Sequence, residues 1–322
     1  MLLWLLPAAT LQAQRGDLLF NPAQLHDVHL HFWQPNFWEL LETNYQDSID
    51  DSGVTVPYLE AAMTIDGFAL DTVGVRFKGL SSFGWSGDFK KGFKIDLNEF
   101  TPGQAFDGIK KFNLHNGACD PGLMRDFVCY DIQRTAGVKA PRVSHGKLFI
   151  NDQYWGLYAI IEQVDKSFVN MNFPDGDGDL VKNIGWSELK WEGDTIETYL
   201  VDFQWKTNED SANHEAFLHL LAVINNAPDS TFAQQIQAVF NVDLFLHALA
   251  VDLMTDNWDS YIDNERNWYL YLEPNSRKWQ WIPWDYNLAL GGDFNFEGNP
   301  YPPFDPTCLI QANFATIQSG NS

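Results

Sequence analysis

The feature that constrains the fold most is a series of short segments between residues 61 and 116 in which apolar and polar residues alternate. Alternation puts apolar side chains on one face of a β-strand and polar side chains on the other. AAMTIDG and DTVGVRFKG, with a Gly-containing turn between them, predict a hairpin, and KGFKIDL and GIKKFNLHN predict two more strands. The first part of the chain is therefore expected to be rich in β-structure.

Helical patterns dominate later in the chain. Asp120 provides a capping carboxylate, Pro121 suits the first helical position, and the apolar periodicity that follows ends at Gly137. Further along, apolar residues recur every three to four positions in NHEAFLHLLAVINNA, TFAQQIQAVF and DLFLHALAVDLMTDN, before strand patterns return in NWYLYLE and KWQWIPWDY. We expect an α+β protein of two lobes: a β-rich lobe with one long helix over residues 15–165, and a mainly helical lobe over residues 166–322.

The first residues resemble an export signal. MLLWLLPAATLQAQRG has a short apolar core followed by small and polar residues around Ala13, although the usual basic leader is missing. We interpret residues 1–14 as a truncated signal peptide and place the start of the mature chain near Gln14, which predicts a secreted or cell-surface protein. The apolar stretch is too short to cross a bilayer, so no membrane span is expected.

The charge balance disfavours one class of partner. The chain has 43 Asp and Glu against 20 Lys and Arg, a formal net charge of −23, which repels nucleic acids. A nucleotide can still bind, because carboxylates that hold a divalent metal reverse the local field. The three cysteines are too few and too scattered for a disulfide framework or a zinc site.

Acidic and amide side chains near the end of the chain occur in an order that suits phosphoryl transfer. Asp259 follows a predicted helix, Asn264 and Asn267 come soon after it, and Asp285 follows the apolar strand WQWIPW. In a phosphotransferase one carboxylate orients the attacking hydroxyl, while an amide and a second carboxylate hold the metal that bridges the phosphates. The protein-kinase motifs H-R-D-L-x-x-x-N and D-F-G are absent from these positions, and either acid alone could be an ordinary turn residue.

A metal-dependent hydrolase is a less favoured class. Its histidines would have to converge with the acids. His26, His29 and His31 lie far upstream, and His115 and His145 belong to the strand-rich lobe. The sequence therefore ranks hydrolysis below phosphoryl transfer.

Several motifs in a fixed order resemble one known family. VGVRFKGLSSFG, GIKKFNLHN, GVKAPRVSHGKLFINDQYWGLYAIIEQVD, NWDSY and WIPWDYNLALGG are similar to segments of the CotH family, the spore-coat-protein-H-type atypical kinases, and the resemblance covers about residues 55–293. It implies a two-lobed, atypical protein-kinase-like fold in an exported protein that uses ATP and Mg²⁺ or Mn²⁺ to phosphorylate Ser or Thr in secreted or surface proteins. Such a lobe usually continues further, so the second lobe is expected to be incomplete, and we expect a monomer. Some members are surface adhesins or coat components, which leaves a non-catalytic role as the alternative.

The resemblance also implies roles for single residues. Asp259 in NWDSY corresponds to the catalytic aspartate, and Asp285 in PWDY corresponds to the metal-binding one. The amide ligand is either Asn267, which keeps the family's N-x-Y-L-Y context, or Asn264, which keeps the five-residue offset of the kinase loop. We prefer Asn267.

The residues that bind the nucleotide are left with alternatives. Lys111, on a predicted strand before the long helix, is the preferred phosphate contact, and Lys91 and Lys78 beside the Gly-rich loop are the other candidates. Asp126 would pair with that lysine, or would be only a first-turn acid favoured by the helix dipole. Glu162 would lie in the link between the lobes that meets the adenine, or at an exposed strand end.

Overall fold

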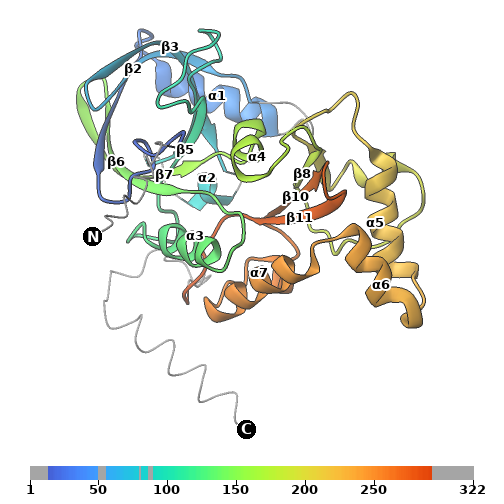
Figure 1. Cartoon of the computed structure of the whole chain (residues 1–322). Coiled ribbons are helices and arrows are strands. Elements are labelled where there is room, and N and C mark those ends of the chain that lie inside the picture. The colour runs from blue at the N-terminus through green and yellow to red at the C-terminus, as the bar shows by residue number, and fades with distance from the viewer. Residues whose placement is uncertain (1–13, 50–55, 80, 86–89, 292–322) are drawn as a thin grey trace, which may run out of the picture.

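The structure, a computed structural model, describes residues 14–49, 56–79, 81–85 and 90–291. The interpreted signal peptide lies outside the described residues, apart from Gln14. The described chain forms a closed β-barrel and a separate four-stranded sheet, with helices packed around them (Figure 1). None of the described helices is both long enough and apolar enough to cross a membrane.

Seven strands close the barrel in the order β1-β2-β3-β4-β5-β7-β6. Their bounds are β1 Leu25–His31, β2 Leu59–Ile65, β3 Phe68–Lys78, β4 Gly92–Asp96, β5 Lys111–His115, β6 Val143–Ile150 and β7 Gln153–Glu162. The ring closes because β1 pairs antiparallel with β2 and parallel with β6. The predicted hairpin is confirmed as the antiparallel pair of β2 and β3, and the two further predicted strands are β4 and β5.

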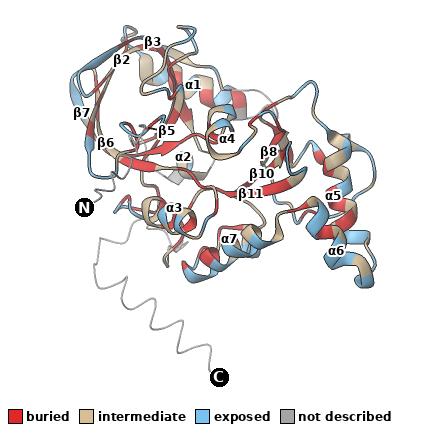
Figure 2. Cartoon of the chain, viewed as in Figure 1, coloured by how far each residue is buried: buried red, intermediate tan, exposed pale blue. Residues whose placement is uncertain are grey.

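The second sheet is antiparallel and has the order β11-β10-β8-β9. Its strands are β8 Leu180–Asn183, β9 Phe203–Trp205, β10 Trp268–Glu273 and β11 Lys278–Pro283. Alternate residues of β10 enter different cores: Trp268 and Leu270 pack with the helices of one face, and Tyr269 and Tyr271 pack with those of the other. Both faces of this sheet are therefore covered, and Figure 2 shows its strands as largely buried.

Five helices cover the second sheet and the adjoining side of the barrel. They are α3 Arg125–Thr135, α4 Lys166–Asn172, α5 His214–Asn226, α6 Asp229–Val239 and α7 Val242–Met254. Helices α3 and α4 share a core with β10 and β11, whereas α5, α6 and α7 pack on the other face of the sheet. The three helical periodicities of the second half are thus confirmed as α5, α6 and α7.

The expected two-lobed, kinase-like fold with a mainly helical second lobe is wrong. The first part of the chain is a closed barrel, and the second part is built on a sheet of its own. Strands β8 and β9 have only four and three residues, too few to display alternation in a sequence. A further helix, α1 Phe37–Ile49, packs on β3 in the part of the chain that was expected to be rich in β-structure.

The long helix starts later than predicted. Leu123 has a left-handed φ of 53°, so the chain turns before α3 begins at Arg125. Asp120 still stabilises the start of the helix, because its Oδ2 accepts a hydrogen bond from the Arg125 N–H at 2.8 Å. The remaining short elements are α2 Ser81–Trp85, α8 Tyr261–Asn264 and a 3₁₀ turn at Ile196–Tyr199.

Candidate active site

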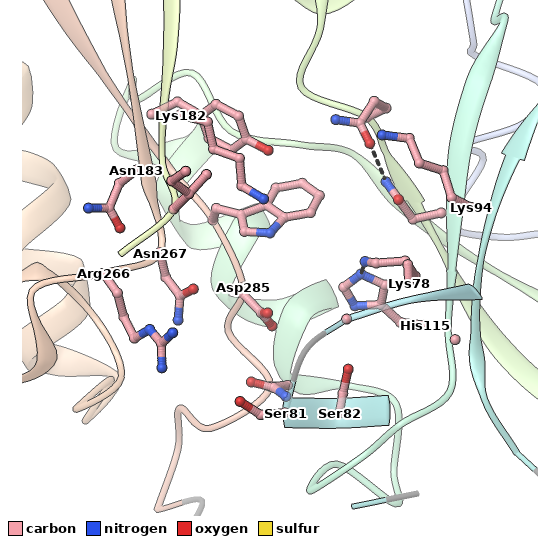
Figure 3. Close-up of a pocket in the computed structure, with 18 of the residues that line it drawn as sticks. Lys78, Ser81, Ser82, Lys94, His115, Lys182, Asn183, Arg266, Asn267 and Asp285 are labelled. Atoms are coloured by element: carbon pink, nitrogen blue, oxygen red, sulfur yellow. Dashed lines mark hydrogen bonds between the residues drawn. The ribbon is translucent and has the colours of Figure 1, made fainter. Parts of the chain in front are cut away.

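A cavity of about 810 Å³ lies between the barrel and the second sheet. Its walls are formed by parts of β3, β4 and β5, by β8 and β9, and by the loops before β10 and after β11. Five of the predicted site residues line it: Lys78, Asp126, Asp259, Asn267 and Asp285. Figure 3 shows Asp285 between Asn267 on one side and Lys78 with His115 on the other.

Asp285 directly follows the loop residue Trp284 at the end of β11 and is held in a strained conformation. Its φ is 59°, in the left-handed region that costs a non-glycine residue about 1 kcal/mol or more. Helix α3 holds this geometry: the Asp285 N–H donates to the Tyr130 hydroxyl at 2.8 Å, and the Tyr286 N–H donates to Asp126 Oδ1 at 2.9 Å. The Oδ1 atom of Asp285 is buried and has no hydrogen-bond partner among the described residues.

Asp259 is oriented by two amides. The Asn267 side chain donates to Asp259 Oδ2 at 2.9 Å and to its backbone carbonyl at 2.7 Å, and the Asn264 side chain donates to Asp259 Oδ1. Asn264 also accepts a hydrogen bond from Trp186 Nε1 at 3.1 Å and does not line the cavity. Of the two amides, Asn267 therefore has the better placed oxygen for a ligand in the cavity, whereas Asn264 acts through Asp259.

His115 brings a nitrogen to the two acids of the cavity. One nitrogen of His115 and one oxygen each from Asp126 and Asp285 lie within 4.8 Å of one another. His115 Nδ1 is 3.2 Å from Asp126 Oδ2, and the Lys78 ammonium donates to His115 Nε2. Asp126 thus contacts Lys78 through an imidazole instead of pairing with it directly.

Burial shifts the pKa of several groups in this cluster. It raises the pKa of Asp126 to about 6 and lowers the pKa of Lys78 to about 8, although the charges of Asp285 and Asp126 oppose the latter shift. The pKa of Asp285 is raised first by burial and then by Asp126, and the pKa of Asp259 is raised first by burial. His115 has its pKa lowered to about 3 by burial and by Lys78. The imidazole is therefore neutral at pH 7, the form that binds metals.

Besides Asn264, three predicted residues do not line the cavity: Lys111, Lys91 and Glu162. The Lys111 ammonium is 2.7 Å from Asp96 Oδ2, its cross-strand neighbour on β4. Lys91 is buried beside Phe83 and donates to the Phe83 carbonyl at 2.7 Å.

Glu162 is also placed elsewhere. Glu162 is 3% exposed and accepts two hydrogen bonds from the Arg142 guanidinium, from Nη2 to Oε1 at 2.7 Å and from Nε to Oε2 at 3.0 Å. Neither the adenine contact nor an exposed strand end fits this buried ion pair.

His115 was not predicted as a site residue because it belongs to the strand-rich lobe, whereas Asp259 and Asp285 belong to the second half of the chain. Lys111, Asn113 and His115 alternate along β5 and share its outward face, so the face chosen for Lys111 was correct. The prediction chose the wrong end of the strand, because Asn113 and His115 line the cavity and Lys111 does not.

Comparison with known proteins gives the family. A family model described as CotH kinase protein matches residues 75–313. The chain belongs to this family. Its relatives include the inner spore coat protein H of Bacillus subtilis, 27% identical over 65% of the chain, and two proteins of Rhizopus delemar, invasin CotH2 (25% over 58%) and invasin CotH3 (24% over 68%). The matched regions make up 58%, 33% and 39% of those proteins' own lengths, so the chain spans less than two thirds of each of these relatives.

Proposed function

We propose that the protein is an ATP-dependent protein kinase that phosphorylates Ser or Thr in secreted or surface proteins and requires Mg²⁺ or Mn²⁺. The observation that carries the proposal is that Asp259, Asn267 and Asp285 line one cavity. They provide a carboxylate for the acceptor hydroxyl and oxygen ligands for a divalent ion, the two parts that phosphoryl transfer needs. The family description and the names of the coat and invasin relatives support a phosphotransferase at a surface.

The donor atoms fit a divalent cation. A buried carboxylate oxygen without a partner is costly unless a cation meets it, and Asp285 Oδ1 is such an atom. Asp285 and Asp126 would hold the ion together with the Asn267 oxygen, and a nitrogen ligand from His115 would favour a transition metal such as Mn²⁺ over Mg²⁺. When bound, the ion neutralises charge on the transferred phosphate.

Side chains of the protein then position the attacking hydroxyl and the phosphate. Asp259 accepts the proton of the attacking hydroxyl, and its two amide partners fix the direction of the carboxylate. Burial raises the pKa of Asp259, which makes the carboxylate a stronger base. Lys78 provides a charge-assisted contact for a phosphate oxygen from the barrel side of the cavity.

A non-catalytic surface role is the second candidate, because relatives are named invasins and a spore coat protein. Isothermal titration with ATP in the presence and absence of Mn²⁺ distinguishes the two. A kinase should bind ATP more tightly with the metal, whereas a pure coat or adhesion protein should show no metal-dependent affinity.

The direct test is transfer of labelled phosphate from ATP to a Ser-rich peptide with Mg²⁺ or Mn²⁺. Wild-type protein should label the peptide, and Asp285→Ala should not. Lys111→Gln is the matched control, because its ammonium pairs with Asp96 outside the cavity. Equal labelling by wild type and Asp285→Ala would remove this residue from the mechanism.

A further inference from the structure

Besides Lys78 and Arg266, four cations of the cavity wall have no carboxylate partner among the described residues. They are Arg76 on β3, Lys94 on β4, Lys182 on β8 and Lys206 just after β9. Within the described part of the chain, none of them has a carboxylate oxygen within 4.0 Å, whereas Lys111 and Arg142 outside the cavity are paired. In a protein of net charge −23, composition alone does not explain such a cluster.

The cluster is electrostatically unfavourable in the absence of an anion. Arg76 and Lys94 are direct cross-strand partners on β3 and β4, and like charges at such positions destabilise a sheet. Burial holds the pKa of Lys94 well below its ordinary value, and the charges of Arg76, Lys182 and Lys206 lower it further. Burial and the charge of Lys182 also lower the pKa of Lys206 to about 8. Repulsion among these four cations therefore lowers the stability of the folded protein when no anion is bound.

The position of the cluster indicates what would offset this repulsion. Figure 3 shows Lys94 and Lys182 projecting into the cavity from the two sheets, with Asp285 below them in this view. The Asp285 charge acts on Lys182 and raises its pKa against the effect of burial, so the cluster adjoins the proposed metal-binding end of the cavity. An extended anion could therefore lie on the cations while one end reaches Asp285.

We propose that Arg76, Lys94, Lys182 and Lys206 form a site that binds a chain of linked phosphates directly, without a metal ion. The inference rests on the proposed function and deepens it, because it assigns these cations to the phosphate chain of the donor nucleotide. Linked phosphates suit the site better than a single small anion, since the four charges are spread over strands of two sheets. The negative charge of the whole protein disfavours a nucleic acid.

Isothermal titration with inorganic tripolyphosphate in EDTA tests the site, because the probe has no base and the chelator removes divalent ions. Wild type should bind it, and Lys94→Gln and Lys182→Gln should each weaken binding by roughly tenfold or more, the value of one charge-assisted contact. Lys111→Gln should bind like wild type. Both cavity variants should also melt at a higher temperature than wild type without ligand, because each removes repulsion.

The outcomes separate the two proposals. ATP that displaces tripolyphosphate supports the donor chain as the natural ligand, whereas simultaneous binding of both would overturn that assignment. Absence of tripolyphosphate binding, or cavity variants that bind normally and melt lower, would show that the cations are structural. Because this binding requires neither metal nor acceptor, it can be observed in Asp285→Ala, where the proposed kinase reaction is lost.

Discussion

Replacing Asp285 by Asn separates metal binding from folding. The amide has the shape of the carboxyl group and tolerates the left-handed φ of 59° at this position. The substitution leaves the backbone N–H bond to the Tyr130 hydroxyl, 2.8 Å long, in place. It removes a negative charge from a side chain whose pKa is raised by burial and by Asp126.

The expected effect on stability follows from the buried negative charge. An unpartnered buried carboxylate is less favourable than an unpartnered buried amide by about 1–3 kcal/mol, and the lost attraction of Asp285 to Lys78 offsets part of the relief. We expect a net gain of roughly 1 kcal/mol, or about 2–4 °C in melting temperature for a protein of this size. An acid whose folded pKa is raised stabilises the protein most at low pH and loses that contribution as the pH rises through the folded pKa. The advantage of the variant should therefore be present at pH 7 and vanish as the pH falls toward the ordinary value of 3.8.

Calorimetric melts with and without Mn²⁺ measure both effects. Mn²⁺ at 100 times its dissociation constant should stabilise wild type by about 2.7 kcal/mol and leave Asp285→Asn nearly unchanged. The reasoning is refuted if the variant melts below wild type in metal-free buffer at pH 7, or if it responds to Mn²⁺ as wild type does.

Three more predictions address the surroundings of the site. Asn264→Ala should reduce phosphate transfer roughly tenfold while metal affinity is kept, because Asn264 only orients Asp259; equal losses of both, by kinetics and titration, would contradict this. Arg142→Ala leaves Glu162 buried and unpaired and should lower the free energy of unfolding in urea by about 3–5 kcal/mol, with unchanged nucleotide affinity. Stability should rise between pH 8 and 9.5, because Lys206 has a folded pKa of about 8 and the unfolded chain holds its proton longer. Urea titrations should show a smaller rise in Lys206→Gln, and an identical rise would count against the assignment.

Local elements could be predicted from the sequence wherever one face of the element is polar. Strands β2 to β5 alternate, and α5 to α7 repeat with helical period, so both types were recognised. Closure of the barrel could not be predicted, because β1 pairs with β6 across more than a hundred residues. A local period in the sequence does not indicate a contact between such distant segments. In the second sheet, the predicted strands NWYLYLE and KWQWIPWDY are confirmed as β10 and β11, whereas β8 and β9 are too short to be predicted.

The site could be predicted only in part for a related reason. Asp259 and Asp285 stood out because an acid, an amide and a second acid follow one another in the order of a phosphotransferase. Alternation gave the outward face of β5 but could not say which end reaches the cavity, so Lys111 was preferred and His115 was passed over. Contacts between distant segments decide that choice.

The most direct test of the account measures nucleotide binding and phosphate transfer on the same Asp259→Asn protein. The account predicts that this variant binds ATP with Mn²⁺ as tightly as wild type within about threefold, and that its labelling of a Ser-rich peptide falls by roughly a hundredfold or more. Labelling at the wild-type rate would contradict the role of Asp259, and a wild-type protein that neither binds ATP with metal nor labels any acceptor would contradict the proposed kinase.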